Sequence, residues 1–173
     1  MIIESFIKFA CRNYMITLFV IGIISALISL LKKPRPWHRK IVINAIFSYF
    51  LLFCIGIVFI YGGLFHIFFP KMIASFIGWE TSPFQLEVGF ASLGFGIVGL
   101  IAFRGRLNFR AAAIIGPAVF LWGAAGGHIY QMISAHNFSP GNAGVILWTD
   151  ILLPIVGFIL LYLQYKLAPA EPT

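Results

Sequence analysis

The 173-residue sequence has few charged residues and only two cysteines. Charged side chains make up 10% of the sequence and hydrophobic ones 61%, whereas soluble domains are about a quarter charged. This composition excludes an ordinary soluble domain and indicates a protein with several membrane spans. The net charge of +7 therefore reports mainly on loops and orientation, and it does not indicate nucleic-acid binding. Cys11 and Cys54 lack the spacing of a metal site and predict no disulfide.

The sequence also lacks the motifs of several enzyme classes. It contains no Gly-rich phosphate loop, no nucleophile elbow and no HExxH helix. It shows no internal repeat and no low-complexity tract. Any chemistry must therefore depend on side chains that are scattered along the chain and meet only in the fold.

Five hydrophobic segments are long enough to cross a bilayer, whose apolar core requires roughly 20 residues of helix. The spans are predicted at about residues 14–31, 41–69, 83–103, 111–135 and 143–165. Between the second and third spans, residues 72–79 predict a short amphipathic helix on the membrane surface. We expect an all-α integral membrane protein with a single domain over residues 1–173. Spans two to five would form a four-helix bundle, and the first span would pack at its periphery.

Polar residues mark the starts of two spans. Ser82, Pro83 and Gln85 predict a capping box for the third span, with Ser82 as the N-cap and Pro83 at the first helical position. Asn142 ends a turn and is expected to cap the fifth span. Trp79, just before the third span, is expected to be an interface or packing aromatic.

The basic residues are distributed unevenly between the two sides of the predicted bundle. One side carries three, namely Lys8, Arg12 and Lys71. The loops after spans one and three, together with the C-terminus, hold nine: Lys32, Lys33, Arg35, Arg39, Lys40, Arg104, Arg106, Arg110 and Lys166. Because cytoplasmic loops are enriched in Lys and Arg, we expect these nine in the cytoplasm, with the N-terminus outside and the C-terminus inside.

Four ionisable residues lie within spans two to five, one on each: His66, Glu87, His128 and Asp150. The helical rise puts the first two roughly 6 Å below their helix ends and the last two roughly 10–12 Å below. All four then fall in the outer half of the membrane. Since isolated ionisable groups are costly in lipid, we expect them to point inward and meet in one polar chamber. Ala91 and Gly94 share a stripe with Glu87, and this stripe is expected to face inward.

Two imidazoles and two carboxylates without a thiolate match the donor set of a divalent metal site in a bundle core. The sequence therefore predicts zinc, iron or manganese bound by the four residues, and haem held by two histidines is less favoured because carboxylates lie nearby. Gln131 and Tyr130 are candidates to orient the ligands. A bound metal with an open position would activate water for redox or hydrolytic chemistry on a small or lipid-soluble substrate.

Other interpretations of the same residues remain open. A network of histidines, carboxylates and water could bind a small ligand or pass protons or ions, although few polar residues continue into the inner half. Taken singly, His128 fits an interhelical hydrogen bond and Glu87 fits a favourable interaction with the helix dipole. A structural membrane subunit, alone or in an oligomer, would need no ligand at all.

Four segments resemble a family of small bacterial inner-membrane proteins of unknown function. They are residues 84–91, 122–132, 137–144 and 149–154, and the resemblance extends over roughly residues 65–161. The motif positions of that family at Glu87, His128 and Asp150 are present here. The chain is also loosely similar to DoxX-like membrane proteins in size and span count. The resemblance implies a bacterial inner membrane, and hence a periplasmic N-terminus, but no established activity.

Overall fold

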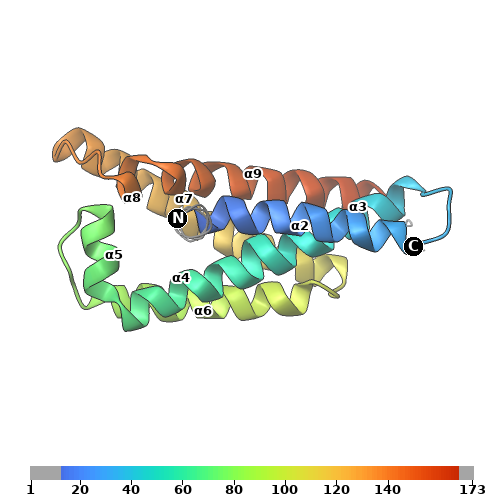
Figure 1. Cartoon of the computed structure of the whole chain (residues 1–173), viewed down its shortest axis with the longest axis horizontal. Coiled ribbons are helices and arrows are strands. Elements are labelled where there is room, and N and C mark those ends of the chain that lie inside the picture. The colour runs from blue at the N-terminus through green and yellow to red at the C-terminus, as the bar shows by residue number, and fades with distance from the viewer. Residues whose placement is uncertain (1–12, 168–173) are drawn as a thin grey trace, which may run out of the picture.

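The computed structural model describes residues 13–167, and within this range the chain is helical, without strands (Figure 1). The helices are α2 (Tyr14–Leu31), α3 (Arg39–Phe50), the π-helical η1 (Leu51–Ile57), α4 (Val58–Phe68), α5 (Pro70–Ile77), α6 (Phe84–Ala102), α7 (Leu107–Ser134), α8 (Pro140–Ala143) and α9 (Val145–Lys166). Within the described residues these elements form five helical segments long and apolar enough to cross a membrane: Tyr14–Leu31, Arg39–Phe68 (α3, η1 and α4), Phe84–Ala102, Leu107–Ser134 and Pro140–Lys166 (α8 and α9). The predicted all-α membrane fold is confirmed.

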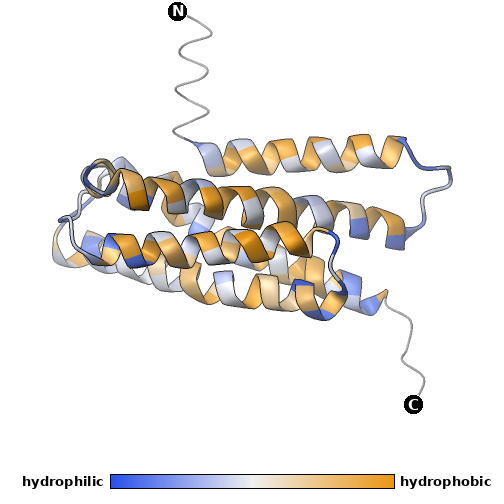
Figure 2. Ribbon diagram, turned by 90° about the horizontal axis from the view of Figure 1, so that it is seen from below, coloured by the Kyte–Doolittle hydropathy of each residue, from blue (hydrophilic) through white to orange (hydrophobic). Residues whose placement is uncertain are grey.

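The second to fifth spans form the bundle and α2 lies against its outside, as the sequence predicts. The most extensive contacts join α4 to α6 and α7 to α9, while α2 packs mainly on α3 and η1. The core is apolar and centred on Phe47, Leu51 and Cys54 of the second span. Figure 2 shows hydrophobic residues along the helices and hydrophilic ones gathered near their ends. This distribution suits a bundle surrounded by lipid, because lipid is as apolar as the core.

The two ends of the bundle differ in composition. One end, called the α8 end here, carries α5, α8 and the beginnings of α2, α6 and α9 (Figure 1). The opposite end, called the α3 end, carries the α2–α3 loop, the beginnings of α3 and α7 and the ends of α6 and α9. The described acidic residues, Glu80, Glu87 and Asp150, belong to the α8 end, whereas most of the basic residues belong to the α3 end.

Glycines allow α6 to approach the second span so closely that the backbones of the two helices are in contact. A Cβ on Gly99 would lie 2.5 Å from the backbone nitrogen of Gly56, and one on Gly63 would lie 2.8 Å from the carbonyl oxygen of Gly89. The inward face of α6 is therefore its glycine face. The predicted stripe is wrong, because Ala91 and Gly94 are exposed, as is Glu87.

Replacing Gly99 with alanine is expected to destabilise the bundle by about 1–3 kcal/mol, the usual cost of overpacking. The added methyl group would meet the backbone of Gly56, which cannot move as a flexible side chain does. Gly94→Ala is the matched control on the same helix, since a Cβ there meets nothing within 4 Å. Thermal unfolding in detergent measures both, and equal melting temperatures for the two variants would contradict the close approach.

Neither predicted cap forms. The N-cap of α6 is Pro83, without a side-chain cap, because Gln85 is hydrogen-bonded to His66 of α4. The N-cap of α9 is Gly144, because Asn142 lies in α8 and is fully buried in other contacts. In both cases a side chain suited to capping is used between helices, where lipid offers no competing hydrogen bond.

α7 begins at Leu107, four residues before the predicted start of the fourth span, and this places Arg110 inside the bundle. Its side chain is only 3% exposed. Its guanidinium donates to the carbonyl oxygens of Ala102 and Phe103 at the end of α6, to Asn44 and Ser48 of α3 and to Gln164 of α9. Arg110, predicted as a loop residue, therefore joins four helices.

Candidate functional site

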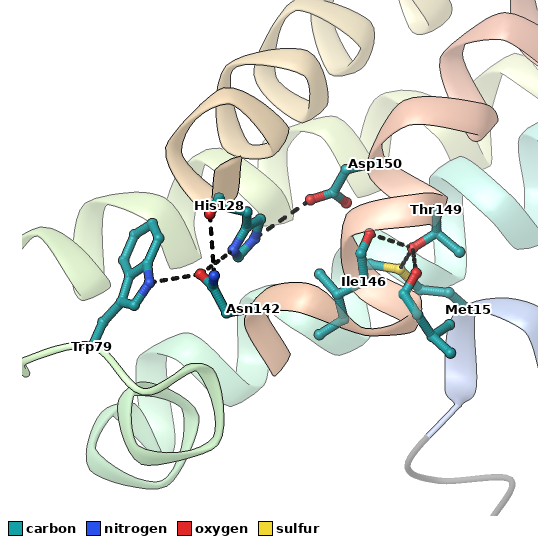
Figure 3. Close-up of polar contacts among 8 residues, drawn as sticks. Met15, Trp79, His128, Asn142, Ile146, Thr149 and Asp150 are labelled. Carbon is teal, nitrogen blue, oxygen red and sulfur yellow. Dashed lines mark hydrogen bonds and ion pairs between the residues drawn. The ribbon is translucent and has the colours of Figure 1, made fainter. Parts of the chain in front are cut away.

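His128 and Asp150 form a buried pair near the α8 end. α7 and α9 pack closely along their length, and each contributes one residue about two turns from that end. The exposed fractions are 5% for His128 and 2% for Asp150. His128 Nε2 lies 3.6 Å from Asp150 Oδ2 (Figure 3). The predicted meeting of these two side chains is found in the structure.

Asn142 of α8 holds the other side of the imidazole. Its amide nitrogen donates to the carbonyl oxygens of His128 and Asn137, at 3.1 and 2.9 Å. Its amide oxygen faces His128 Nδ1 at 2.8 Å and accepts from Trp79 Nε1 at 2.9 Å. The Trp79 ring also lies beside the imidazole, with the two ring centroids 5.3 Å apart (Figure 3). Asn142 thus connects α7 to the loop between α5 and α6.

These contacts fix the position of one proton on His128. An amide oxygen only accepts hydrogen bonds, so the Nδ1 atom that faces it must carry hydrogen. In a neutral imidazole Nε2 is then an acceptor, and it faces a carboxylate oxygen of Asp150. Two acceptors repel each other in a buried site unless a positive species lies between them. A proton on Nε2 or on the carboxyl group would remove this repulsion, and the separation of 3.6 Å exceeds that of an ordinary hydrogen bond.

The first span is attached beside this pair. Thr149 Oγ1, adjacent to Asp150 in sequence, lies 2.8 Å from the sulfur of Met15 in α2 and 2.8 Å from the carbonyl oxygen of Ile146 (Figure 3). α2 contributes few other contacts to α9. This contact joins the start of α2 to the part of α9 that holds the carboxylate.

The other two predicted ligands do not join the pair. His66 Nδ1 of α4 is hydrogen-bonded to Gln85 Oε1 of α6, and Glu87 is exposed in the first turn of α6. No group of three or more His, Cys, Asp or Glu side chains within residues 13–167 is placed to share a metal ion. The four residues expected in one chamber are thus divided between a pair on α7 and α9, a contact between α4 and α6, and a surface position.

The candidates for ligand support lie elsewhere too. Tyr130 is 66% exposed, and Gln131 is half-buried. Within the described residues, neither side chain is hydrogen-bonded to His128 or Asp150; Asn142 makes the contact that was predicted for them.

Comparison with known families gives a match over most of the chain. The model of a family described as a family of unknown function, DUF6790, matches residues 12–170. The chain belongs to this family. A comparison of this DUF6790 chain with curated proteins found no match, and neither did one with solved structures. The resemblance to an uncharacterised family is confirmed, while the bacterial origin and the likeness to DoxX-like proteins stay predictions.

Sequence reasoning missed Asn142 and Trp79 as parts of the site in this DUF6790 chain. The sequence predicts Asn142 as a cap and Trp79 as an interface or packing aromatic, yet both belong to the hydrogen-bond network around the imidazole. One signal was available for Asn142, since it lies in the segment 137–144 that carries part of the family resemblance. Trp79 carried no such signal, because it lies 49 residues before His128 and meets it only through the fold.

Proposed function

We propose that this chain is an integral membrane protein that binds one cation between His128 and Asp150, and that this cation is a proton. The observation that carries the proposal is the pair of facing acceptors, His128 Nε2 and Asp150 Oδ2, with Nδ1 already committed to Asn142. A proton between them turns this repulsion into attraction. Buried ionisable residues in a membrane span are functional candidates, because isolated charges there are costly.

Binding of this proton would change the hydrogen bonds that Asn142 makes at the α8 end. When His128 Nε2 takes up this proton, the imidazole becomes an imidazolium whose Nδ1–H bond to Asn142 is stronger, since charge-assisted hydrogen bonds are the stronger kind. Asn142 in turn holds Trp79 of the α5–α6 loop. We therefore propose that protonation of the pair changes how Asn142 of α8 is held against the α5–α6 loop.

A complete proton pathway is less well supported than a binding site. The described Asp, Glu and His residues belong to the α8 end, apart from His38 in the α2–α3 loop. No carboxylate or imidazole of the described residues therefore continues from Asp150 through the bundle. Chains of such groups are the usual proton relays of transporters.

The proposed location is a bacterial inner membrane with the α3 end in the cytoplasm. The nine basic residues of the predicted inner side include the α2–α3 loop and Arg104 and Arg106 between α6 and α7. The placement of these residues on the cytoplasmic side follows from the positive-inside rule. The His128–Asp150 pair would then lie in the periplasmic half of the membrane, where it would respond to the external pH.

Trp79 offers a direct test of proton binding. In a variant that keeps only this tryptophan (Trp37→Phe, Trp122→Phe and Trp148→Phe), we expect its fluorescence to fall as the pH is lowered through about 8 to 5. The physical reason is that an imidazolium quenches a neighbouring indole, and the His128 ring lies 5.3 Å from it. Steady-state fluorescence of the purified protein in detergent, recorded as a function of pH, measures this decrease.

Two substitutions in the same background decide whether this decrease in Trp79 fluorescence, called the fluorescence step here, arises from protonation of the His128–Asp150 pair. Asp150→Asn and His128→Gln should each abolish it, whereas His136→Gln, which changes an exposed loop histidine, should leave it intact. A step that survives in Asp150→Asn, or no step in the parent variant, would overturn the proposal and favour a purely structural pair.

A divalent metal is the second candidate, and one distance favours it. Two ligands of a tetrahedral zinc lie about 3.4 Å apart, close to the 3.6 Å between Nε2 and Oδ2. An Nδ1–H donated to an amide oxygen is also the usual support of a ligating histidine. Zinc, iron or manganese would need further ligands from water, substrate or residues outside 13–167. Any of the three would supply hydrolytic chemistry, and iron or manganese would also supply redox chemistry. About one equivalent of metal in the purified protein, lost in His128→Ala and kept in His136→Ala, would establish this candidate over the proton.

A further inference from the structure

A second polar region lies at the α3 end, far along the bundle from His128 and Asp150. A pocket of about 460 Å³ is lined there by Lys33, Lys40, Asn44, Gln164, Leu107 and Leu167. These residues come from the α2–α3 loop, the start of α3, the start of α7 and the end of α9. The pocket thus lies where four spans reach one membrane surface.

Arg110 lies directly behind the wall of this pocket. Its Nη1 donates to Asn44 Oδ1 at 3.0 Å and to Gln164 Oε1 at 3.2 Å, and Gln164 Nε2 donates to the same oxygen of Asn44 at 3.1 Å. The guanidinium is charged at all ordinary pH values. Both amide oxygens accept these bonds, and within residues 13–167 the amide N–H groups of Asn44, which lines the pocket, donate to no acceptor.

The positive charge around the pocket has no acidic partner within residues 13–167. Lys33 and Lys40 are exposed at the rim, and the acceptors of Arg110 are all neutral. The carbonyl oxygens at the end of α6 offset only part of this charge through the helix dipole. A site with two ammonium groups, a guanidinium behind them and free amide donors is complementary to an anion.

We infer that this pocket binds the phosphate of an anionic phospholipid headgroup from the surrounding leaflet. Basic pockets between spans on the cytoplasmic side are a known type of site for such headgroups. Leu107 and Leu167 provide an apolar wall beside the basic groups, which suits a lipid with acyl chains better than a free phosphate ion. This inference does not depend on the His128–Asp150 pair.

Thermal unfolding of the purified full-length protein in detergent tests the lipid site. Phosphatidylglycerol at about ten times its dissociation constant is expected to raise the melting temperature by about 3–6 °C, while phosphatidylcholine and inorganic phosphate are expected to have little effect. The double variant Lys33→Gln/Lys40→Gln should lose this increase, because it removes both ammonium groups from the pocket.

The control removes the same charge from the same face. Lys32→Gln/Arg39→Gln changes two exposed residues outside the set that lines the pocket, and it should keep the full increase. Equal losses in the two double variants would show a general attraction of the surface for anionic lipid and overturn the site. An equal increase with phosphatidylcholine would do the same. An increase produced in full by inorganic phosphate would overturn the lipid assignment and identify a soluble anion as the ligand.

Discussion

Replacing Arg110 with methionine is expected to lower the stability of the bundle by about 3–5 kcal/mol, because several buried neutral acceptors would lose their donor at about 1–3 kcal/mol each, partly recovered by rearrangement and water. The side chain is 3% exposed and donates to acceptors on α3, α6 and α9. Methionine fills similar space but donates nothing. For a chain of this size, the loss corresponds to a fall of roughly 6–20 °C in the melting temperature.

The stabilising effect of Arg110 comes from its fork of donors as well as from its charge. Arg110→Lys keeps the charge, but an ammonium has three donors on a single nitrogen and cannot reach acceptors on both sides of the planar fork. We expect its melting temperature to lie between those of the wild type and Arg110→Met. A melting temperature equal to that of the wild type would show that charge alone is required.

Arg104→Met is the matched control, because Arg104 is an exposed arginine just before α7. Its removal is expected to change stability by no more than about 0.5 kcal/mol. Thermal unfolding followed by circular dichroism in detergent compares the three variants. If Arg110→Met and Arg104→Met unfolded at the same temperature, the role of Arg110 in joining the helices would be refuted.

The number of spans could be predicted from the sequence because length and hydropathy define a span without any knowledge of its neighbours. The inward face of each span could not be predicted in the same way. In lipid both faces of a helix are apolar, so the contrast that marks the buried face of a soluble helix is missing. The sequence therefore predicts the wrong inward face of α6, that of Glu87, Ala91 and Gly94, and gives no sign of the close approach at Gly99.

The candidate site was predictable only in part, for a related reason. Depth in the membrane follows from the rise per residue, and it correctly suggested that His128 and Asp150 are near one another. Equal depth does not determine which helices are adjacent. Because α4 packs on α6 and α7 on α9, His66 meets Gln85 and remains apart from the pair.

Polar residues with a familiar local role were the most difficult to assign. Arg110 follows two exposed arginines and the sequence predicts it in their loop, although α7 already includes it. Asn142 follows Ser-Pro-Gly, a turn sequence that favours capping, yet its side chain is directed at another helix. In each case the tertiary hydrogen bonds decide the outcome, since a polar group in a membrane must find partners within the protein.

Asn142→Ala is expected to cause the other large effect, a loss of about 2–4 kcal/mol of stability together with the loss of the Trp79 response to pH. The fully buried amide satisfies Trp79 Nε1, His128 Nδ1 and the carbonyl oxygens of His128 and Asn137. Each buried group left without a partner costs about 1–3 kcal/mol, and water entering the vacated space would recover part of this. Asn108→Ala, an exposed asparagine of α7, is the control.

A double-mutant cycle separates the contact with Trp79 from the rest of the network. Trp79→Phe removes only the indole N–H and part of the ring, and in the wild-type background it should cost about 1 kcal/mol for the lost hydrogen bond. In the Asn142→Ala background that bond no longer exists, so the same substitution should cost less, with a coupling energy of about 0.5–3 kcal/mol. Additive losses would mean that Trp79 and Asn142 stabilise the protein independently. The imidazole would then be connected to the α5–α6 loop only by its ring contact with Trp79. A proton at His128 would have no hydrogen-bonded route through Asn142 by which to change the α8 end.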